Sequence, residues 1–125
     1  MKNLKVKVIG MATAMMIMAF AGSALADSVS TTEFGTFTYT LTKSGTTVTA
    51  ETSITKYVST TKVITTLEVQ DNATGTPLAN VSRTVTGGSS SSVSAANLTS
   101  TKLAAFSSHE ARGNSSTVKY SSSTF

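Results

Sequence analysis

The only histidine of the chain, His109, lies in the stretch SSHEARG, beside Glu110 and three residues before Arg112. A serine hydrolase would need such a histidine as its general base, with a serine nucleophile and an acid that orients the ring. Neighbouring residues of a strand point to opposite faces, so His109 and Glu110 cannot converge on one substrate, whereas Glu110 and Arg112 can pair. A G-x-S-x-G nucleophile elbow is absent. We therefore expect no catalytic residue and no enzyme, and a secreted hydrolase is the less favoured alternative.

Signals for metals and cofactors are equally sparse. A single histidine and six scattered acidic residues show no zinc or EF-hand spacing, and the chain has no cysteine. The stretch DNATG, residues 71–75, shares only an Asp-x-x-x-Gly skeleton with calcium loops and lacks their later glutamate. Gly87 and Gly88 are followed by serines, so no phosphate-binding loop is present. The sequence predicts neither a metal nor a cofactor.

The stretch TFTYTLT, residues 36–42, places a threonine at every second position. Phe37, Tyr39 and Leu41 alternate with these threonines, which is the period of a strand with one buried face and one solvated face. Rows of threonine also occur on ice-binding or ligand-binding faces, but those faces usually need a repeating coil. The threonine pairs of this chain fall at uneven intervals, so no such period emerges. We interpret the threonines as the solvated side of a strand.

Further alternating stretches follow at intervals of roughly 10 residues. The stretch KSGT, residues 43–46, predicts a turn in which Gly45 adopts a positive φ, and a return strand follows at residues 48–54. More strands are expected at residues 60–70, 80–86, 102–108 and 116–122.

The fold predicted from these strands is all-β, a small antiparallel β-sandwich or barrel of about six to seven strands. The stretches DNATGTP, GGSSSS and RGN supply turns or loops between them. Arg83 shares a strand face with Val81 and Val85, so its guanidinium should extend past the edge of the core or pair with a carboxylate.

The first 26 residues have the order of a secretory signal peptide. Three lysines precede an uncharged apolar run that reaches Phe20, and Ala24-Leu25-Ala26 supplies the small residues that a signal peptidase requires. We expect a leader helix over residues 1–26, cleavage between Ala26 and Asp27, and one secreted β domain over residues 27–125. The apolar run approaches the roughly 20 residues that span a bilayer, so an uncleaved membrane anchor is the alternative. After cleavage no membrane span would remain.

The apparent basicity of the chain belongs to this leader. The full chain has 10 Lys+Arg against 6 Asp+Glu, but three of the lysines lie within the first seven residues and all the acidic residues follow the leader. The remaining roughly 100 residues, a length suited to one core, therefore carry a net charge near +1. This balance gives no reason to expect a nucleic-acid partner.

Each asparagine after the leader begins an N-x-S/T triplet, a pattern shared by Asn72, Asn80, Asn97 and Asn114. These are glycan acceptors where the machinery exists and ordinary turn residues in a bacterium with general secretion only. The leader, rich in lysine and methionine, favours a bacterial source.

Small β-sandwiches act mainly through their surfaces, so we expect a small exported surface or extracellular module with a binding or structural role. Its contacts would come from loops such as DNATGTP and GGSSSS or from edge strands. The partner would be a surface protein, a glycan, or a second copy through edge-strand self-association. Tyr57 and Tyr120 are the plausible sugar-stacking residues outside the first strand. A secreted bacteriocin-like toxin is the alternative, consistent with the small size but supported by no motif.

Overall fold

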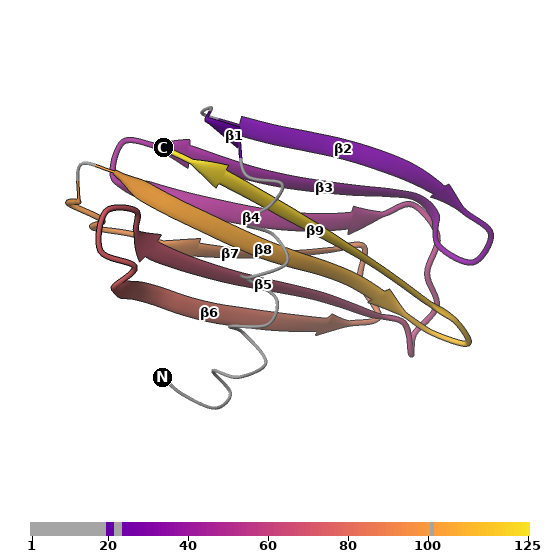
Figure 1. Cartoon of the computed structure of the whole chain (residues 1–125). Coiled ribbons are helices and arrows are strands. Elements are labelled where there is room, and N and C mark those ends of the chain that lie inside the picture. Colours follow the sequence, from indigo (N-terminus) through magenta and orange to yellow (C-terminus); the bar gives the residue numbers. More distant parts are fainter. Residues whose placement is uncertain (1–19, 22–23, 101) are drawn as a thin grey trace.

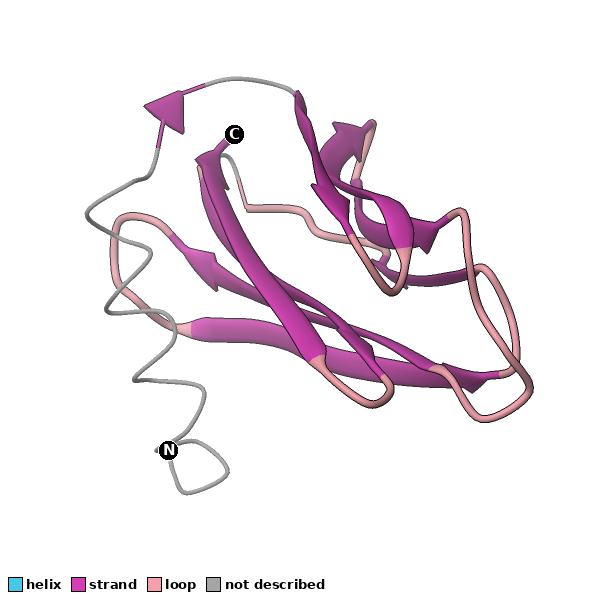
Figure 2. Ribbon diagram, turned by 90° about the vertical axis from the view of Figure 1, so that its right-hand side faces the viewer, coloured by secondary structure: helices cyan, strands magenta, loops and turns pink. Residues whose placement is uncertain are grey.

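The computed structural model describes residues 20–21, 24–100 and 102–125, and these residues form strands and turns without a helix (Figure 2). The strands are β1 (Phe20–Ala21), β2 (Ala24–Thr31), β3 (Gly35–Ser44), β4 (Thr47–Ile54), β5 (Lys62–Asp71), β6 (Pro77–Thr86), β7 (Ser90–Ala95), β8 (Leu103–Arg112) and β9 (Ser116–Thr124). One sheet has the strand order β1-β9-β8-β5-β6 and the other has the order β2-β3-β4-β7 (Figure 1). Within the described ranges, no helical segment has the length and hydropathy that a bilayer crossing requires.

The predicted all-β class is confirmed. Strands β2 to β9 pair antiparallel within their sheets, and β1 pairs parallel with β9. Leu41 of one sheet and Leu67 of the other belong to the same buried cluster, so the sheets pack face to face. Of the two predicted architectures, the chain therefore forms the sandwich.

The predicted number of about six to seven strands is too low, because the sequence pattern does not indicate β2 and β7. The large apolar residues of β2, Leu25 and Val29, are four positions apart, and the strand overlaps the predicted cleavage region. β7 buries Ser91, Val93 and Ala95 at alternate positions. Two of these three side chains are small or polar, which hides the period of the strand in the sequence.

Most of the predicted leader, residues 1–19 and 22–23, lies outside the described residues, so the signal peptide and its helix stay predictions. The described residues before Asp27 are extended: Phe20–Ala21 pairs with the end of β9, and Leu25 and Ala26 pair with β3. The predicted cleavage point between Ala26 and Asp27 therefore falls inside β2.

The threonines of β3 lie on the outer face of their sheet, as predicted. Phe37 and Leu41 are completely buried, whereas Thr36 is exposed and the next three threonines are half-buried. The same outer face continues onto β4 and β7, where Thr49 and Ser94 are paired and their hydroxyl oxygens lie 2.9 Å apart. The row of hydroxyls is thus the solvated side of a sheet.

A band of polar side chains crosses the interior and divides the apolar core into two parts. The larger half-core contains Leu41, Val48, Ala50, Leu67, Val69, Val93, Ala95, Leu98, Leu103 and Ala105. The smaller half-core contains Phe34, Phe37, Ile54, Val63 and Ala111. Between them lie the fully buried Thr52, Thr65 and His109. We call these three residues with Ser91 and Ser107 the polar band.

Two further sequence expectations are confirmed at the edges of the sandwich. Arg83 points to the same face as Val81 and Val85 yet is exposed, so its guanidinium extends past the core edge as predicted. Gly45, in the turn between β3 and β4, has a φ of +60°, the left-handed conformation predicted for that glycine.

Candidate functional site

His109 lies in the middle of β8 and its side chain is fully buried between the sheets. The strand register places it beside Thr65 of β5, and its ring centroid lies 5.3 Å from that of Tyr39 in the facing sheet. Glu110, the next residue, points to the outer face and forms an ion pair of 2.9 Å with Arg112. The alternation predicted for these three residues is therefore confirmed.

The hydrogen bonds of the polar band have a fixed direction, because a carbonyl oxygen can only accept. The Thr65 hydroxyl donates to the Ser91 carbonyl at 3.0 Å, so Thr65 Oγ1 accepts from the Thr52 hydroxyl at 2.7 Å. Thr52 Oγ1 then accepts from His109 Nδ1 at 2.8 Å. His109 Nε2 is left as the acceptor of the Ser107 hydroxyl at 2.7 Å. This chain of bonds assigns the Nδ1–H tautomer to the neutral ring.

Burial lowers the pKa of His109 to about 4, against a smaller opposing effect of a hydrogen bond to the Glu51 backbone. The ring is therefore neutral at pH 7, and both of its nitrogens are engaged within the protein. A general base must come within hydrogen-bond reach of the proton that it removes. His109 is closed to solvent in the folded chain, so its geometry is that of a structural residue.

A more accessible arrangement lies at the end of the sandwich next to the smaller half-core. Four connections meet there: residues 32–34 between β2 and β3, residues 55–61 between β4 and β5, residues 87–89 between β6 and β7, and residues 113–115 between β8 and β9. We call this region the loop end. Two adjoining hollows of about 390 Å³ and 280 Å³ open on it, and Glu33 and Val58 line both.

Glu33 fastens two of these connections to each other. One carboxylate oxygen accepts the backbone N–H of Asn114 at 2.8 Å, and the other accepts the backbone N–H and the hydroxyl of Ser115 at 2.8 Å and 2.6 Å. These bonds, that from the Ser115 hydroxyl above all, lower the pKa of Glu33. Glu33 thus joins the β2–β3 turn of one sheet to the β8–β9 turn of the other.

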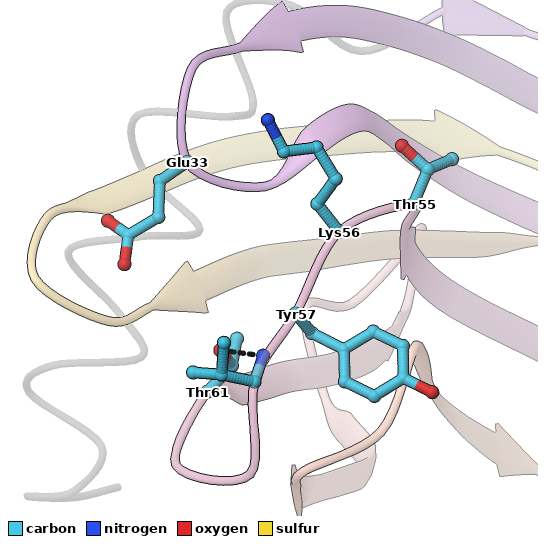
Figure 3. Close-up of a pocket in the computed structure, with 6 residues that line it drawn as sticks. Glu33, Thr55, Lys56, Tyr57 and Thr61 are labelled. Atoms are coloured by element: carbon cyan, nitrogen blue, oxygen red, sulfur yellow. Dashed lines mark hydrogen bonds between the residues drawn. The ribbon is translucent and has the colours of Figure 1, made fainter.

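The connection of residues 55–61 forms most of the larger hollow (Figure 3), and several hydrogen bonds hold it in place. Thr55 Oγ1 accepts the backbone N–H of Thr36 at 2.9 Å, and Lys56 Nζ donates to the Thr32 carbonyl at 3.0 Å. The Val58 N–H donates to Thr61 Oγ1 at 2.9 Å, which closes the tip of the connection. The loop is therefore built as a fixed surface.

Two apolar side chains on this connection face solvent. Tyr57 is 49% exposed and Val58 is 64% exposed, the latter being the most exposed of the large hydrophobic residues in the described chain. In Figure 3 the Tyr57 ring extends away from the Glu33 carboxylate, so the ring lies at the rim of the hollow. Aromatic and aliphatic side chains held in this way are typical of binding surfaces.

The smaller hollow is lined largely by polar and charged side chains. Lys62 and Arg112 occupy adjacent positions of β5 and β8, and Thr60 and Asn114 complete the lining with Glu33, Val58 and Gly113. Lys62 and Arg112 are both exposed. With Lys56 in the larger hollow, three cationic side chains line the two hollows together with Glu33, whose carboxylate is already hydrogen-bonded to residues 114 and 115.

No protein-family model, curated protein or solved structure matches this chain. The function must therefore be inferred from the geometry of the chain itself. Among the described residues, no group of three or more His, Cys, Asp or Glu side chains is placed to hold a metal ion.

Of the two contact loops named from the sequence, GGSSSS begins at the loop end and DNATGTP lies at the opposite end. In the stretch DNATGTP, the Asp71 carboxylate accepts the N–H groups of Ala73 and Thr74 and the Ser100 hydroxyl, which closes a tight turn at the opposite end of the sandwich. Residues 87–89 of GGSSSS form the β6–β7 connection at the loop end, where the Gly87 N–H donates to the Thr61 carbonyl at 2.8 Å, and residues 90–92 belong to β7.

One feature of the sequence indicates the exposed connection of the loop end. After Ile54 the strand alternation stops, and Lys-Tyr-Val follows at residues 56–58 without a glycine or proline. Of these three, the sequence indicates a role only for Tyr57, as a plausible sugar-stacking residue.

Proposed function

We propose that this chain is a small exported, non-enzymatic module that binds a partner through its loop end, at a bacterial cell surface or outside the cell. The observation that supports this best is the exposure of Tyr57 and Val58 beside two hollows on connections fixed by hydrogen bonds. Binding that requires no reordering of a loop retains more of the contact free energy. The fixed loop end meets this condition.

Export is part of the proposal and rests on the order of residues in the first 26 positions, with basic, apolar and small residues in turn. Expression of the full gene in a secreting bacterium tests it directly. Protein recovered outside the cytoplasm with the mass of a chain that begins at Asp27 would support both export and the predicted cleavage. Protein retained in the cytoplasm at full length would contradict export.

Edge-strand self-association has weaker support than the loop end. β6 is the outermost strand of its sheet, but the carbonyl of Arg83 near its middle accepts a hydrogen bond of 3.0 Å from the Ser91 hydroxyl of β7. A strand edge engaged in this way is less open to a second chain. We therefore assign partner binding to the loop end.

The binding experiment uses protein purified after expression of the full gene and isolated bacterial envelopes. We expect saturable binding that Val58→Ser weakens by about tenfold, since Val58 lines both hollows. Leu78→Ser is the matched control, because Leu78 is also an exposed aliphatic residue, 41% exposed, and lies on β6. Circular dichroism and thermal melting confirm that both variants are folded.

Two results would contradict the proposal. The first is an absence of saturable binding to any envelope preparation. The second is an equal loss of binding in Val58→Ser and Leu78→Ser, because this would place the contact elsewhere or show a general effect on the fold.

A further inference from the structure

We propose that the loop end recognises an anionic polysaccharide, with a sugar ring on Tyr57 and the acidic groups of the chain beside Lys56, Lys62 and Arg112. This inference rests on the proposed function, because it names the ligand of the same surface. It follows from the hydrogen-bonding groups that the loop end leaves available, from its charge, and from the position of its one exposed ring.

The larger hollow offers mainly hydrogen-bond donors. Lys56 uses one of the three N–H bonds of its ammonium group on the Thr32 carbonyl. Thr55 is exposed, and in the bonds recorded for the described residues its hydroxyl acts only as the acceptor of a backbone N–H, which leaves its proton to donate; Thr61, which also lines the hollow, is buried. The carboxylate of Glu33, the negative group in the lining, is occupied by residues 114 and 115. A ligand rich in acceptor oxygens matches this arrangement.

The smaller hollow adds positive charge. Lys62 and Arg112 are exposed, and Arg112 uses only Nε in its ion pair with Glu110, so its two terminal amino groups face solvent or a ligand. Glu33, which also lines this hollow, keeps its charge through a lowered pKa but directs both oxygens at the turn of residues 113–115. The three cations outnumber the two carboxylates, Glu33 and Glu110, by one, so the region of the two hollows has a small positive net charge that favours carboxylate or other anionic groups.

The exposed ring favours a sugar over an acidic peptide. Tyr57 presents about half of its surface at the rim of the larger hollow, next to the donors of Thr55 and Lys56. A sugar ring offers an apolar face to the aromatic ring and hydroxyl and carboxylate oxygens at its edge, so one unit can use both features together. The side chain of an acidic peptide would use the cations but would leave the ring without a role.

The experiment measures binding of the purified chain to polygalacturonate, a carboxylated polysaccharide. Dextran serves as the neutral polysaccharide and poly-glutamate as the acidic peptide. We expect binding to polygalacturonate that weakens as salt is raised, with much weaker binding to the other two polymers. Tyr57→Ala and the double substitution of Lys56→Gln and Lys62→Gln should each weaken it by about tenfold.

Matched controls are available for both substitutions. Tyr120 of β9 is 49% exposed, the same fraction as Tyr57, and lies outside the lining of both hollows. Lys102 is exposed near the opposite end of the sandwich, where its carbonyl accepts the N–H of Asn72. Tyr120→Ala and Lys102→Gln should leave binding unchanged.

The possible failures separate the two proposals. Equal binding to poly-glutamate, with no effect of Tyr57→Ala, would overturn the assignment to a polysaccharide. Preference for dextran would overturn the assignment of an anionic ligand. In either case, or if no polymer binds, envelope binding that remains sensitive to Val58→Ser would keep the proposed function. Loss of both kinds of binding would overturn both proposals.

Discussion

The Nδ1 nitrogen of His109 lies 2.8 Å from the Oγ1 oxygen of Thr52, and this contact joins the two sheets inside the core. Because the donor of each bond in the polar band is determined by the next, the contact has one direction, from His109 to Thr52. A buried polar group costs little only when it is bonded. The band is therefore stable as a complete set, and each member is sensitive to the loss of another.

Replacement of Thr52 by valine should destabilise the fold by about 1 to 3 kcal/mol, since it leaves the His109 N–H and the Thr65 oxygen without their buried partner. Thr49→Val is the matched control on the same strand, because the Thr49 hydroxyl is bonded to Ser94 on the solvated face. There we expect a change within about 0.5 kcal/mol. Urea unfolding measures both. Similar decreases in the free energy of unfolding of the two variants would show that the polar band contributes no more to stability than a hydrogen bond on the surface.

The stability of the wild-type chain should fall as the pH is lowered from about 6.5 to about 4. In this interval the folded state keeps His109 neutral, because burial lowers its pKa to about 4, while the unfolded chain takes up a proton near the ordinary value of 6.5. The unfolded state thus binds more protons, so the free energy of unfolding decreases as the pH falls, by about 3 kcal/mol over the whole interval.

The difference between wild type and His109→Gln isolates this effect from the titration of carboxylates. Because His109 is the only histidine, its imidazole signals in an NMR titration are unambiguous and also report the tautomer. We expect a proton on Nδ1 and no titration above pH 5. A midpoint near 6.5 in the folded chain would contradict both the burial and the assigned bonds.

Substitution of Glu33 by glutamine should release the turn of residues 113–115, because an amide group has a single acceptor oxygen where the carboxylate uses two. Hydrogen exchange at the amides of Asn114 and Ser115 should become faster. In the wild type the same protection is present above the ordinary pKa of a glutamate and is lost as the pH falls through the lowered pKa of Glu33. Glu110→Gln, which removes the ion pair with Arg112, should leave both amides unchanged.

Alanine at Gly87 should cost more stability than alanine at Gly75. Both glycines have positive φ, +72° and +75°, so an added side chain is strained at either position. A Cβ atom at Gly87 would also lie 2.9 Å from the Ser59 carbonyl oxygen, whereas a Cβ atom at Gly75 would have no neighbouring atom within 4 Å. We expect Gly87→Ala to be less stable by about 1 kcal/mol more than Gly75→Ala. Equal thermal melting temperatures of the two variants would show that the backbone around Ser59 moves to make room for the added methyl group.

Period-2 alternation of large apolar and polar residues predicted most of the fold. Phe37 and Leu41 marked β3, and Val63, Leu67 and Val69 marked β5, because each buries a large side chain at alternate positions. β7 was missed because small side chains give the same burial without the same contrast. The strand order was also beyond prediction, since alternation indicates which face is buried but not which strand lies beside it.

The candidate site was harder to predict than the fold. Glu33 and Asn114 are separated by 81 positions in sequence, and only the packing of the two sheets brings their turns together. The burial of His109 could be anticipated from the outward direction of Glu110, but its bond to Thr52 depends on how the two sheets are placed against each other. Sequence patterns describe single strands, whereas both features are made by several.

The division of the core has a consequence for local opening. The loop end rests on the smaller half-core of five residues, and the polar band separates it from the larger apolar cluster. Breaking contacts around Phe34 and Phe37 need not expose Leu41 or Leu103, so the two ends of one domain can open with different free energies. A ligand bound at the loop end would then slow amide hydrogen exchange mainly around the smaller half-core. The slowing of amide exchange on binding would therefore decrease along the strands away from the loop end, and it would decrease most sharply at the polar band.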